Sequence, residues 1–258
     1  SSAASDLYKR QGNAGHVLLL GGLPRYAGAT VLAAHAALRA GCGKLTVLDD
    51  APAAHPALWP EVMRASARNK NEVIGLAADV DALCVGPGLG RDEGQLARLQ
   101  LLRRSTRPQV WDADALWALG RWPDLMPARA VLTPHPGEAA SMLETSVAAV
   151  QADRAGALQQ LVKKWESVVV LKGARTLVGA PERLPVVVPQ GHPGMGVGGM
   201  GDALAGIIAA LLAQGHDLFD AAVAGAWLLG STADALWVQR GYSLLPHDVI
   251  DALRVGPV

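Results

Sequence analysis

A chain of 258 residues, half of them apolar, is long enough to bury the core of one α/β domain. Its 23 basic and 23 acidic residues balance, which argues against nucleic-acid or anionic-membrane partners, and its seven Trp, three Tyr and one Phe offer few platforms for single strands. Two cysteines in apolar runs exclude a disulfide framework, and neither a signal peptide nor an uninterrupted membrane-length apolar run is evident. We therefore expect a soluble, cytoplasmic protein.

The first half of the chain alternates buried strands with helices. Apolar runs predict strands, and periodic spacing predicts helices between them. The stretch 51–71 is rich in Pro, Ala and His and is expected to be an irregular surface excursion. The expected strands are 16–22, 44–48, 81–85, 109–111 and 130–132, and the helices are 27–40, a segment ending near 102, 115–119 and a segment ending near 143.

The second half of the sequence predicts one more helix and strand, then a β-hairpin, and then a helical C-terminal region. A helix at 152–164 precedes a strand at 167–171, strands at 176–178 and 186–188 pair, and helices cover 203–214, 218–238 and 247–254. Continuous apolar strands that alternate with helices indicate a mostly parallel sheet covered on both faces, here as one domain over 1–258. Ligands of such sheets bind beyond the carboxyl ends of the strands, where the polar and glycine motifs of this chain fall.

The most informative motif is Gly191–Gly206, GHPGMGVGGMGDALAG, which runs directly into an apolar helix. A glycine-rich loop at a helix N-terminus presents unpaired N–H groups that bind phosphate. Asp202 falls in the first helical turn, where the dipole should keep its carboxylate ionised, as a proton acceptor requires. The motif predicts a phosphoryl seat beside a base, although a tight turn with a capping acid is the simpler alternative.

Two further motifs follow strands three and four. Gly86–Gly90 (GPGLG) lets the backbone approach a ligand closely, or it is only a strand-to-helix turn. Asp112 ends the next strand and is the better site candidate, because Asp114 is expected to cap the following helix.

The last two strand ends carry three candidates. His135 stands between prolines, which suits a rigid ligand contact, and Glu138 opens a helix whose dipole it complements. Lys172 ends a strand, either as a phosphate contact or as a solvated charge. Trp227 and Trp237 are interpreted as helix-packing residues, and His192 shows no zinc-ligand spacing.

Six segments stand in unbroken order between about Lys9 and Ala235: GGLPRYAGATVLAAHAALRAGCGKLTVL, VGPGLG, WDADAL, LTPHPGE, VVLKGART and HPGMGVGGMGDALAGIIAALL. Together they resemble the ADP/ATP-dependent NAD(P)H-hydrate dehydratases, a ribokinase-like family of nicotinamide-repair enzymes. The resemblance implies a three-layer α/β/α sandwich with a mostly parallel central sheet. It also implies that a nucleotide phosphoryl group activates the hydroxyl of the hydrated (6S) nicotinamide ring, which eliminates to regenerate NADH or NADPH.

The resemblance assigns roles to this chain's own residues. Asp202 would be the base, and Gly199, Met200 and Gly201 the anion hole. ADP or ATP would be the co-substrate, with Mg²⁺ and phosphate near Glu138 and no residue assigned as a metal ligand. It also implies a homo-oligomer, often a tetramer. The epimerase domain that is sometimes fused N-terminally in the family is not expected in this sequence. The nucleotide would be held by Lys172, Gly173, Ala174, Arg175 and Thr176, and the hydrate by Ala29, Gly88, Asp112, His135 and Asp202.

Five positions depart from the family pattern: Leu23, Thr30, Trp117, His192 and Met200. The family usually has Ser, Pro, Asn, Asn and Thr there, so the substrate pocket is affected more than the phosphate site. Two alternatives stay open. One is a kinase of the same fold that phosphorylates an alcohol such as a vitamin precursor. The other is a nucleotide-binding relative without catalysis, against which an intact Asp202 argues.

Overall fold

The computed structural model describes residues 14–22, 24–48, 57–66 and 69–255. Their strands form one sheet in the order β3-β2-β1-β4-β5-β6-β7-β8-β9. The strands from β3 to β7 are parallel, whereas β8 and β9 form an antiparallel edge. The strands are β1 (His16–Leu20), β2 (Lys44–Leu48), β3 (Met63–Ala65), β4 (Ala82–Val85), β5 (Gln109–Trp111), β6 (Ala130–Leu132), β7 (Val168–Leu171), β8 (Thr176–Gly179) and β9 (Val186–Val188).

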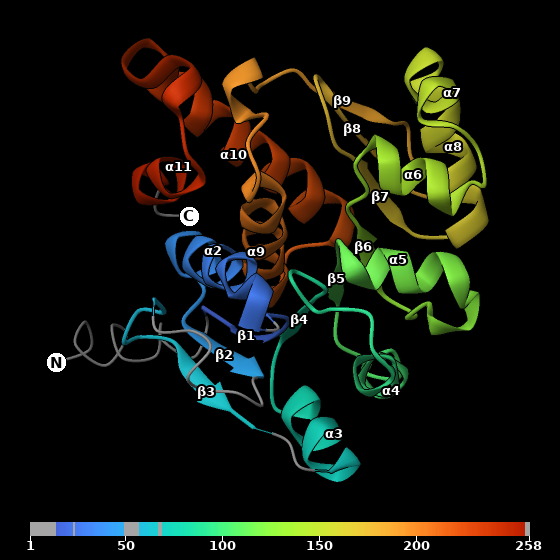
Figure 1. Cartoon of the computed structure of the whole chain (residues 1–258), viewed down its shortest axis with the longest axis vertical. Coiled ribbons are helices and arrows are strands. Elements are labelled where there is room, and N and C mark those ends of the chain that lie inside the picture. The colour runs from blue at the N-terminus through green and yellow to red at the C-terminus, as the bar shows by residue number, and fades with distance from the viewer. Residues whose placement is uncertain (1–13, 23, 49–56, 67–68, 256–258) are drawn as a thin grey trace, which may run out of the picture.

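Helices cover both faces of this sheet, as the apolar strands require. One core lies under α2, α9, α10 and α11, and a second lies under the helices from α3 to α8. Figure 1 shows these two groups on opposite sides of the sheet. The helices are α2 (Ala27–Arg39), α3 (Lys70–Ala78), α4 (Glu93–Leu102), α5 (Asp114–Arg121), α6 (Pro136–Met142), α7 (Val147–Ala152), α8 (Arg154–Trp165), α9 (Met200–Ala213), α10 (Leu218–Arg240) and α11 (Pro246–Ala252).

The predicted three-layer α/β/α arrangement is confirmed, with three local differences. β3 and α3 lie in and after the stretch expected to be irregular, where Asn69 caps α3 by accepting hydrogen bonds from the N–H groups of Asn71 and Glu72. α7 was not expected; it ends at Ala152, and Asp153 then caps α8, which matches the helix expected at 152–164. α9 begins three residues early because Gly199, with φ +102°, forms its N-cap.

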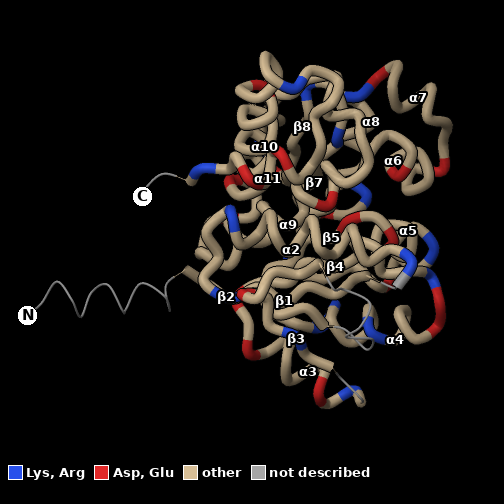
Figure 2. Tube along the Cα trace, turned by 60° about the vertical axis from the view of Figure 1, so that its left-hand side comes forward, with Lys and Arg blue, Asp and Glu red and all other residues tan. Residues whose placement is uncertain are grey.

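Charge and hydropathy add two observations about the whole molecule. Lys and Arg alternate with Asp and Glu over the traced chain (Figure 2). Among the described residues, the segment Leu218–Ser243 is long and apolar enough to cross a membrane by length and composition alone. Its α10 packs on α9 and on the sheet, as the core helix of a globular domain does.

Candidate active site

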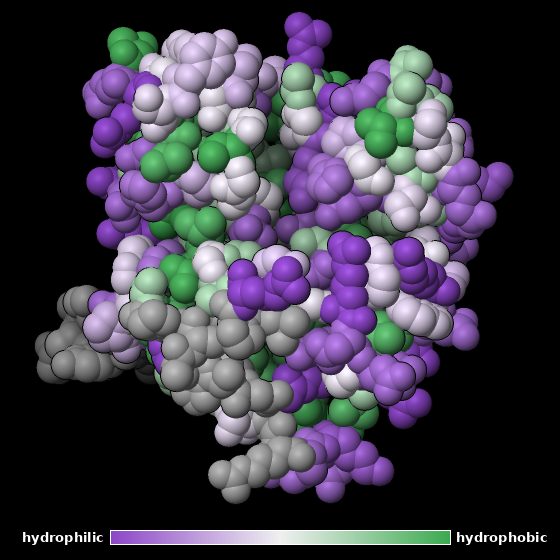
Figure 3. Space-filling model, in the orientation of Figure 1, coloured by the Kyte–Doolittle hydropathy of each residue, from purple (hydrophilic) through white to green (hydrophobic). Residues whose placement is uncertain are grey.

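A cavity of about 760 Å³ opens at the carboxyl ends of β5, β6 and β7, between these strand ends and the start of α9. This face of the molecule is hollowed between the α9–α10 side and the α6–β8 side (Figure 3). The walls gather the predicted phosphate loop, the predicted nucleotide segment and three strand-end residues. These lining residues include Asp112, His135, Glu138, Lys172, Gly173, Ala174, Arg175, Thr176, Gly199, Met200, Gly201 and Asp202.

The phosphate loop owes its shape to two glycines. A Cβ on Gly199 would lie 2.4 Å from Leu32 Cδ1, and φ is +102°, so only glycine fits there. A Cβ on Gly201 would lie 3.1 Å from Lys172 Nζ and would fill the space beside that ammonium. The first intrahelical bond runs from the Ala203 N–H to the Gly199 carbonyl, so the preceding N–H groups have no intrahelical acceptor and suit an anion.

Asp202 occupies the first turn of α9 and lines the cavity. Burial, and then the neighbouring Asp112 carboxylate, raise the pKa of Asp202 to about 7, against a smaller opposing effect of Lys172. The expectation that the helix dipole keeps this group firmly ionised is therefore corrected, because desolvation outweighs it. A carboxyl group with a pKa near 7 suits a general base at neutral pH.

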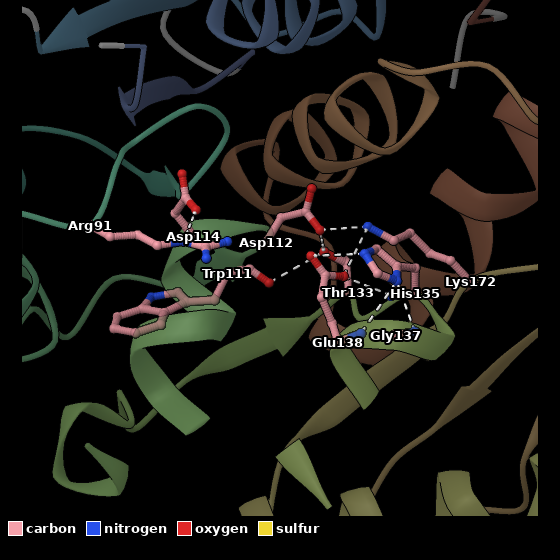
Figure 4. A network of polar contacts seen from close by, with 9 residues as sticks. All are labelled: Arg91, Trp111, Asp112, Asp114, Thr133, His135, Gly137, Glu138 and Lys172. Atoms are coloured by element: carbon pink, nitrogen blue, oxygen red, sulfur yellow. Dashed lines mark hydrogen bonds and ion pairs between the residues drawn. The ribbon is translucent and has the colours of Figure 1, made fainter. Parts of the chain in front are cut away.

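Lys172 lies at the centre of an acidic cluster and is mostly buried. Its ammonium is 2.6 Å from Asp112 Oδ1 and 3.8 Å from Glu138 Oε2, and Figure 4 shows Asp112 and Lys172 pointing toward each other. Thr133 Oγ1 donates to the same Asp112 oxygen at 2.8 Å. Desolvation lowers the pKa of Lys172, but Asp112 and Glu138 outweigh it and leave the pKa raised. The alternative of a solvated lysine is therefore wrong.

His135 and Glu138 form a reciprocal cap at the start of α6. His135 Nδ1 accepts hydrogen bonds from the N–H groups of Gly137 and Glu138, and Glu138 Oε2 accepts one from the His135 N–H. Because Nδ1 is an acceptor, the proton of a neutral His135 ring is on Nε2. The pKa of Glu138 is raised, chiefly by burial. His135 keeps a 56% exposed side chain at the cavity rim, where it is available to a ligand.

Arg154, the first residue of α8, shapes the loop after β7, a role that was not predicted from the sequence. Its guanidinium donates to the carbonyl groups of Leu171 (3.0 Å), Lys172 (3.3 Å) and Ala174. A Cβ on Gly173, where φ is +139°, would lie 3.1 Å from Arg154 Nη2. The loop that lines the cavity is thus folded around one arginine, and an Arg inside a helical pattern gives no sequence signal of this.

A second missed feature is an aromatic stack at the rim. The His192 ring stacks on Trp237 with centroids 3.1 Å apart, and His192 Nδ1 accepts a hydrogen bond from the Gly194 N–H. Trp237 packs edge-on against Tyr242. Trp227, expected to pack between helices, is instead 51% exposed on α10.

Ala29 and Gly88 line a second hollow of about 440 Å³, together with Arg25, Arg91 and Asp114. Ala29, Gly88 and His135 were predicted to line one crevice. In the structure they line two adjoining hollows, with His135 in the first and Ala29 and Gly88 in the second. The turn after β5 separates them: Ala113 lines the first and Asp114 the second.

Asp114 does not cap α5 as expected, because Ala113, with φ +49°, is the N-cap residue. The turn directs the two neighbouring acids apart, Asp112 toward Lys172 and Asp114 toward Arg91 (Figure 4). Asp114 accepts hydrogen bonds from the Gly90 N–H at 2.9 Å and from Arg91 Nε at 2.8 Å. The carboxylate therefore fixes the Gly86–Gly90 turn.

Four of the five departures from the family pattern have a described environment, and Leu23 lies outside the described residues. Thr30 is buried, and its hydroxyl donates to the Pro87 carbonyl at 3.3 Å, which ties α2 to the glycine turn. The guanidinium groups of Arg91 and Arg121 both lie over the Trp117 ring, with their Cζ atoms 4.8 and 4.2 Å from its centroid. Met200 is buried and leaves its N–H at the start of α9.

The side chains that could bind a metal ion show whether one fits this site. No group of three or more His, Cys, Asp or Glu among the described residues is arranged to hold a metal ion. Asp112 and Glu138 still provide two carboxylates beside the predicted phosphate seat. Mg²⁺ is commonly held by one or two carboxylates together with substrate phosphates, so these residues fit an ion that arrives with a nucleotide.

Sequence comparison gives an independent result. The NAD(P)H-hydrate dehydratase family profile matches residues 17–254. A Vibrio cholerae bifunctional NAD(P)H-hydrate repair enzyme is 42% identical over 247 residues, which are 95% of this chain and 50% of that protein. A Neisseria meningitidis ADP-dependent (S)-NAD(P)H-hydrate dehydratase is 40% identical over 97% of this chain and 87% of its own. The chain thus spans about half the length of the bifunctional relative.

Structure comparison agrees. The Bacillus subtilis ADP/ATP-dependent NAD(P)H-hydrate dehydratase, co-crystallised with ATP and Mg²⁺, has a TM-score of 0.82 and 30% identity, and the match covers 94% of this chain and 88% of that one. The ribokinase-like fold expected from the sequence is confirmed by such matches.

Proposed function

Because the chain belongs to the NAD(P)H-hydrate dehydratase family, we propose that it removes water from the (6S) hydrate of NADH or NADPH in a reaction driven by ADP or ATP. The observation that carries the proposal is the position of Asp202. Its carboxyl group, with a pKa of about 7, lines the cavity at the N-terminus of α9. A base and a phosphoryl seat are thereby adjacent.

In this mechanism Asp202 accepts the proton of the substrate hydroxyl while that oxygen takes the terminal phosphoryl group of the nucleotide. Phosphate then leaves as the ring loses a neighbouring proton, which restores the double bond of NADH or NADPH. The N–H groups of Gly199, Met200 and Gly201 stabilise the charge on the phosphoryl oxygens, and no covalent bond to the protein is needed. The raised pKa lets Asp202 take up and return its proton near pH 7.

Lys172, Gly173, Ala174, Arg175 and Thr176 are proposed to hold the nucleotide. They line the same cavity as the phosphate loop, and Arg154 fixes the backbone of this segment. The Lys172 ammonium lies beside the Asp112 carboxylate and lowers the pKa of Asp202, so it balances carboxylates and attracts phosphate. His135 and Asp112 contact the hydrate on the other side of Asp202.

Mg²⁺ is proposed to arrive bound to the nucleotide phosphates, with Asp112 and Glu138 as the nearest carboxylates. The ion would offset the negative charge of the transferred phosphoryl group. This chain's own residues orient that arrangement: Thr133 and Lys172 fix Asp112, and the His135 N–H fixes Glu138.

We also propose a cytoplasmic homo-oligomer, with a tetramer as the form that the family resemblance implies. Exposed apolar side chains on the outer side of α10, such as Trp227 and Val238, support an interface there. Light scattering after size exclusion tests the assembly, and a monomer at micromolar concentration would contradict it.

The activity itself is tested with the protein, Mg²⁺, ADP or ATP, and NADHX or NADPHX. The expected result is regenerated NADH or NADPH absorbance together with one inorganic phosphate per turnover, and loss of both in Asp202→Asn. A stable phosphate ester of an alcohol substrate would indicate a kinase instead. Nucleotide binding without turnover of any substrate would indicate a non-catalytic relative.

A further inference from the structure

The second hollow, lined by Arg25, Tyr26, Gly28, Ala29, Gly88, Arg91 and Asp114, has its own chemistry. Arg25 and Arg91 supply two positive charges to its lining, and Asp114 supplies one negative charge. Asp114 is already engaged by the Gly90 N–H and by Arg91 Nε, which leaves the rest of the Arg91 fork on a side chain that is 55% exposed. Arg25 lies over the Tyr26 ring, with its Cζ 5.0 Å from the centroid. The hollow is therefore a cationic site on a structured wall.

The two hollows differ in charge. The first contains Asp112, Glu138 and Asp202 against Lys172 and Arg175, so beyond the nucleotide phosphates it favours a neutral group over a further anion. The second places Arg25 and Arg91 near the backbone of Gly88. A ligand with a neutral ring and an anionic tail is thus oriented by the charges alone, ring toward Asp202 and tail toward the arginines.

The backbone that borders the hollows leaves no room for a side chain at Gly88. A Cβ on Gly88 would lie 2.6 Å from the Tyr26 carbonyl oxygen, and at φ +63° a side chain is disfavoured as well. Ala113, with φ +49°, turns the chain so that Asp112 and Asp114 face different hollows. Strain of this kind persists where the surrounding structure requires it, and it clusters at ligand sites.

We propose that Arg25 and Arg91 bind the pyrophosphate group of the dinucleotide hydrate, so that the substrate spans the Ala113 turn with its hydrated ring at Asp202 and its phosphates in the second hollow. This subsite rests on the proposed function. Guanidinium groups bind phosphate oxygens in a bidentate manner, which an exposed fork held at Nε by Asp114 is arranged to do. A small alcohol contacts only one hollow, so the subsite also selects dinucleotides over such alcohols.

The test is a double variant, Arg25→Ala with Arg91→Ala, compared with Arg121→Ala. Arg121 also lies over the Trp117 ring but lines neither hollow, which makes it a matched loss of charge. We expect KM for NADHX to rise at least tenfold in the double variant, with kcat and KM for ADP within twofold of the unmodified protein. Arg121→Ala should leave all three constants unchanged.

A substrate without phosphate separates binding of the tail from damage to the site. The hydrate of reduced nicotinamide riboside should have the same KM with the unmodified protein and the double variant. An equal loss with this substrate, or no change with NADHX, would overturn the proposal. Arg25→Ala alone removes a surface charge without touching Asp114 and should raise KM for NADHX about threefold or more, which covers the case of a misfolded double variant.

The subsite and the proposed activity fail differently. If the unmodified protein dehydrates no hydrate, the proposed activity is wrong, and titration with intact NADPH then tests the subsite by itself. Binding of NADPH that weakens at least tenfold in the double variant and not in Arg121→Ala would support it. Equal binding by all three proteins would overturn it.

Discussion

The carboxyl group of Asp202 has a pKa of about 7 because burial and the nearby Asp112 carboxylate disfavour its charged form. Below that pH it is protonated and cannot accept a proton. We therefore expect kcat/KM to fall about tenfold per pH unit below pH 7. Asp202→Asn should lower kcat about 10²–10⁴-fold and remove this acid limb, while ADP binding stays nearly intact. A variant that retains more than half of the native rate would show that another group is the base.

The same pKa predicts how Asp202 affects stability. The folded pKa of about 7 lies above the ordinary value of 3.8 for an Asp side chain, so the folded state binds more protons between these two values. The contribution of Asp202 to the unfolding free energy is therefore most favourable below pH 4 and is lost as the pH rises through 7. Asp202→Asn, which is neutral at every pH, should raise Tm by about 2–6 °C at pH 8 and change it little at pH 4. A Tm difference independent of pH would contradict this.

Lys172 is the counter-charge of the cluster, and its removal should be costly. Lys172→Met leaves Asp112 and Glu138 without their shared ammonium, so we expect about 3 kcal/mol of destabilisation at pH 8. Because Lys172 lowers the pKa of Asp202, the acid limb of kcat/KM should also move to higher pH. Denaturant unfolding and a pH profile measure the two effects. Lys70→Met, on exposed α3, is the control and should change neither.

The candidate site was predictable from sequence where one motif contains its own geometry. The glycines before α9 and the place of Asp202 in its first turn follow from local rules. The environment of Asp202 does not, because its pKa depends on Asp112 and Lys172, which arrive from other strand ends. No local pattern could reveal that Lys172 is buried against Asp112, 60 residues away, or that Arg154 holds the following loop.

At the level of elements, α8 supports the nucleotide wall through its first residue. Arg154→Met keeps the length of the side chain but removes donors from the carbonyl groups of Leu171 and Lys172. We expect KM for ADP to rise about tenfold with kcat changed less than threefold, because the loop loses order and not chemistry. Arg154→Lys should restore part of the loss, and Lys163→Met, exposed on the same helix, should have no effect. An unchanged KM for ADP in Arg154→Met would contradict the positioning role.

Strands were easier to predict than the helices between them. The buried runs of β2, β5 and β6 begin and end where the apolar pattern predicts, since each strand is covered on both faces. α3 was missed because its start depends on one capping residue, Asn69, after a stretch rich in Pro and Ala. The break between α7 and α8 depends in the same way on Asp153, whose carboxylate accepts a hydrogen bond from the Gly156 N–H.

On the scale of the whole molecule, α9 joins the site to the core. Its first turn forms the phosphate seat, and nearly all of the rest is buried between α2, α10 and the sheet. α2 in turn contributes Ala29 to the second hollow and Thr30 to the Pro87 contact. The position of both hollows therefore depends on how closely α2 and α9 approach.

That close approach depends on one glycine, which gives a prediction about global stability. A Cβ on Gly206 in α9 would lie 2.0 Å from the carbonyl oxygen of Ala33 in α2, and a backbone atom cannot move aside cheaply. Gly206→Ala should lower the unfolding free energy by about 3 kcal/mol and Tm by about 6–12 °C, in spite of the better helix propensity of alanine. Gly75→Ala in α3, where a Cβ would meet nothing within 4 Å, should instead stabilise by about 0.5–1 kcal/mol. Denaturant unfolding measures the sign of the change in unfolding free energy for each variant. Opposite signs would separate the effect of close packing from that of helix propensity. Equal effects would show that α2 and α9 separate without cost.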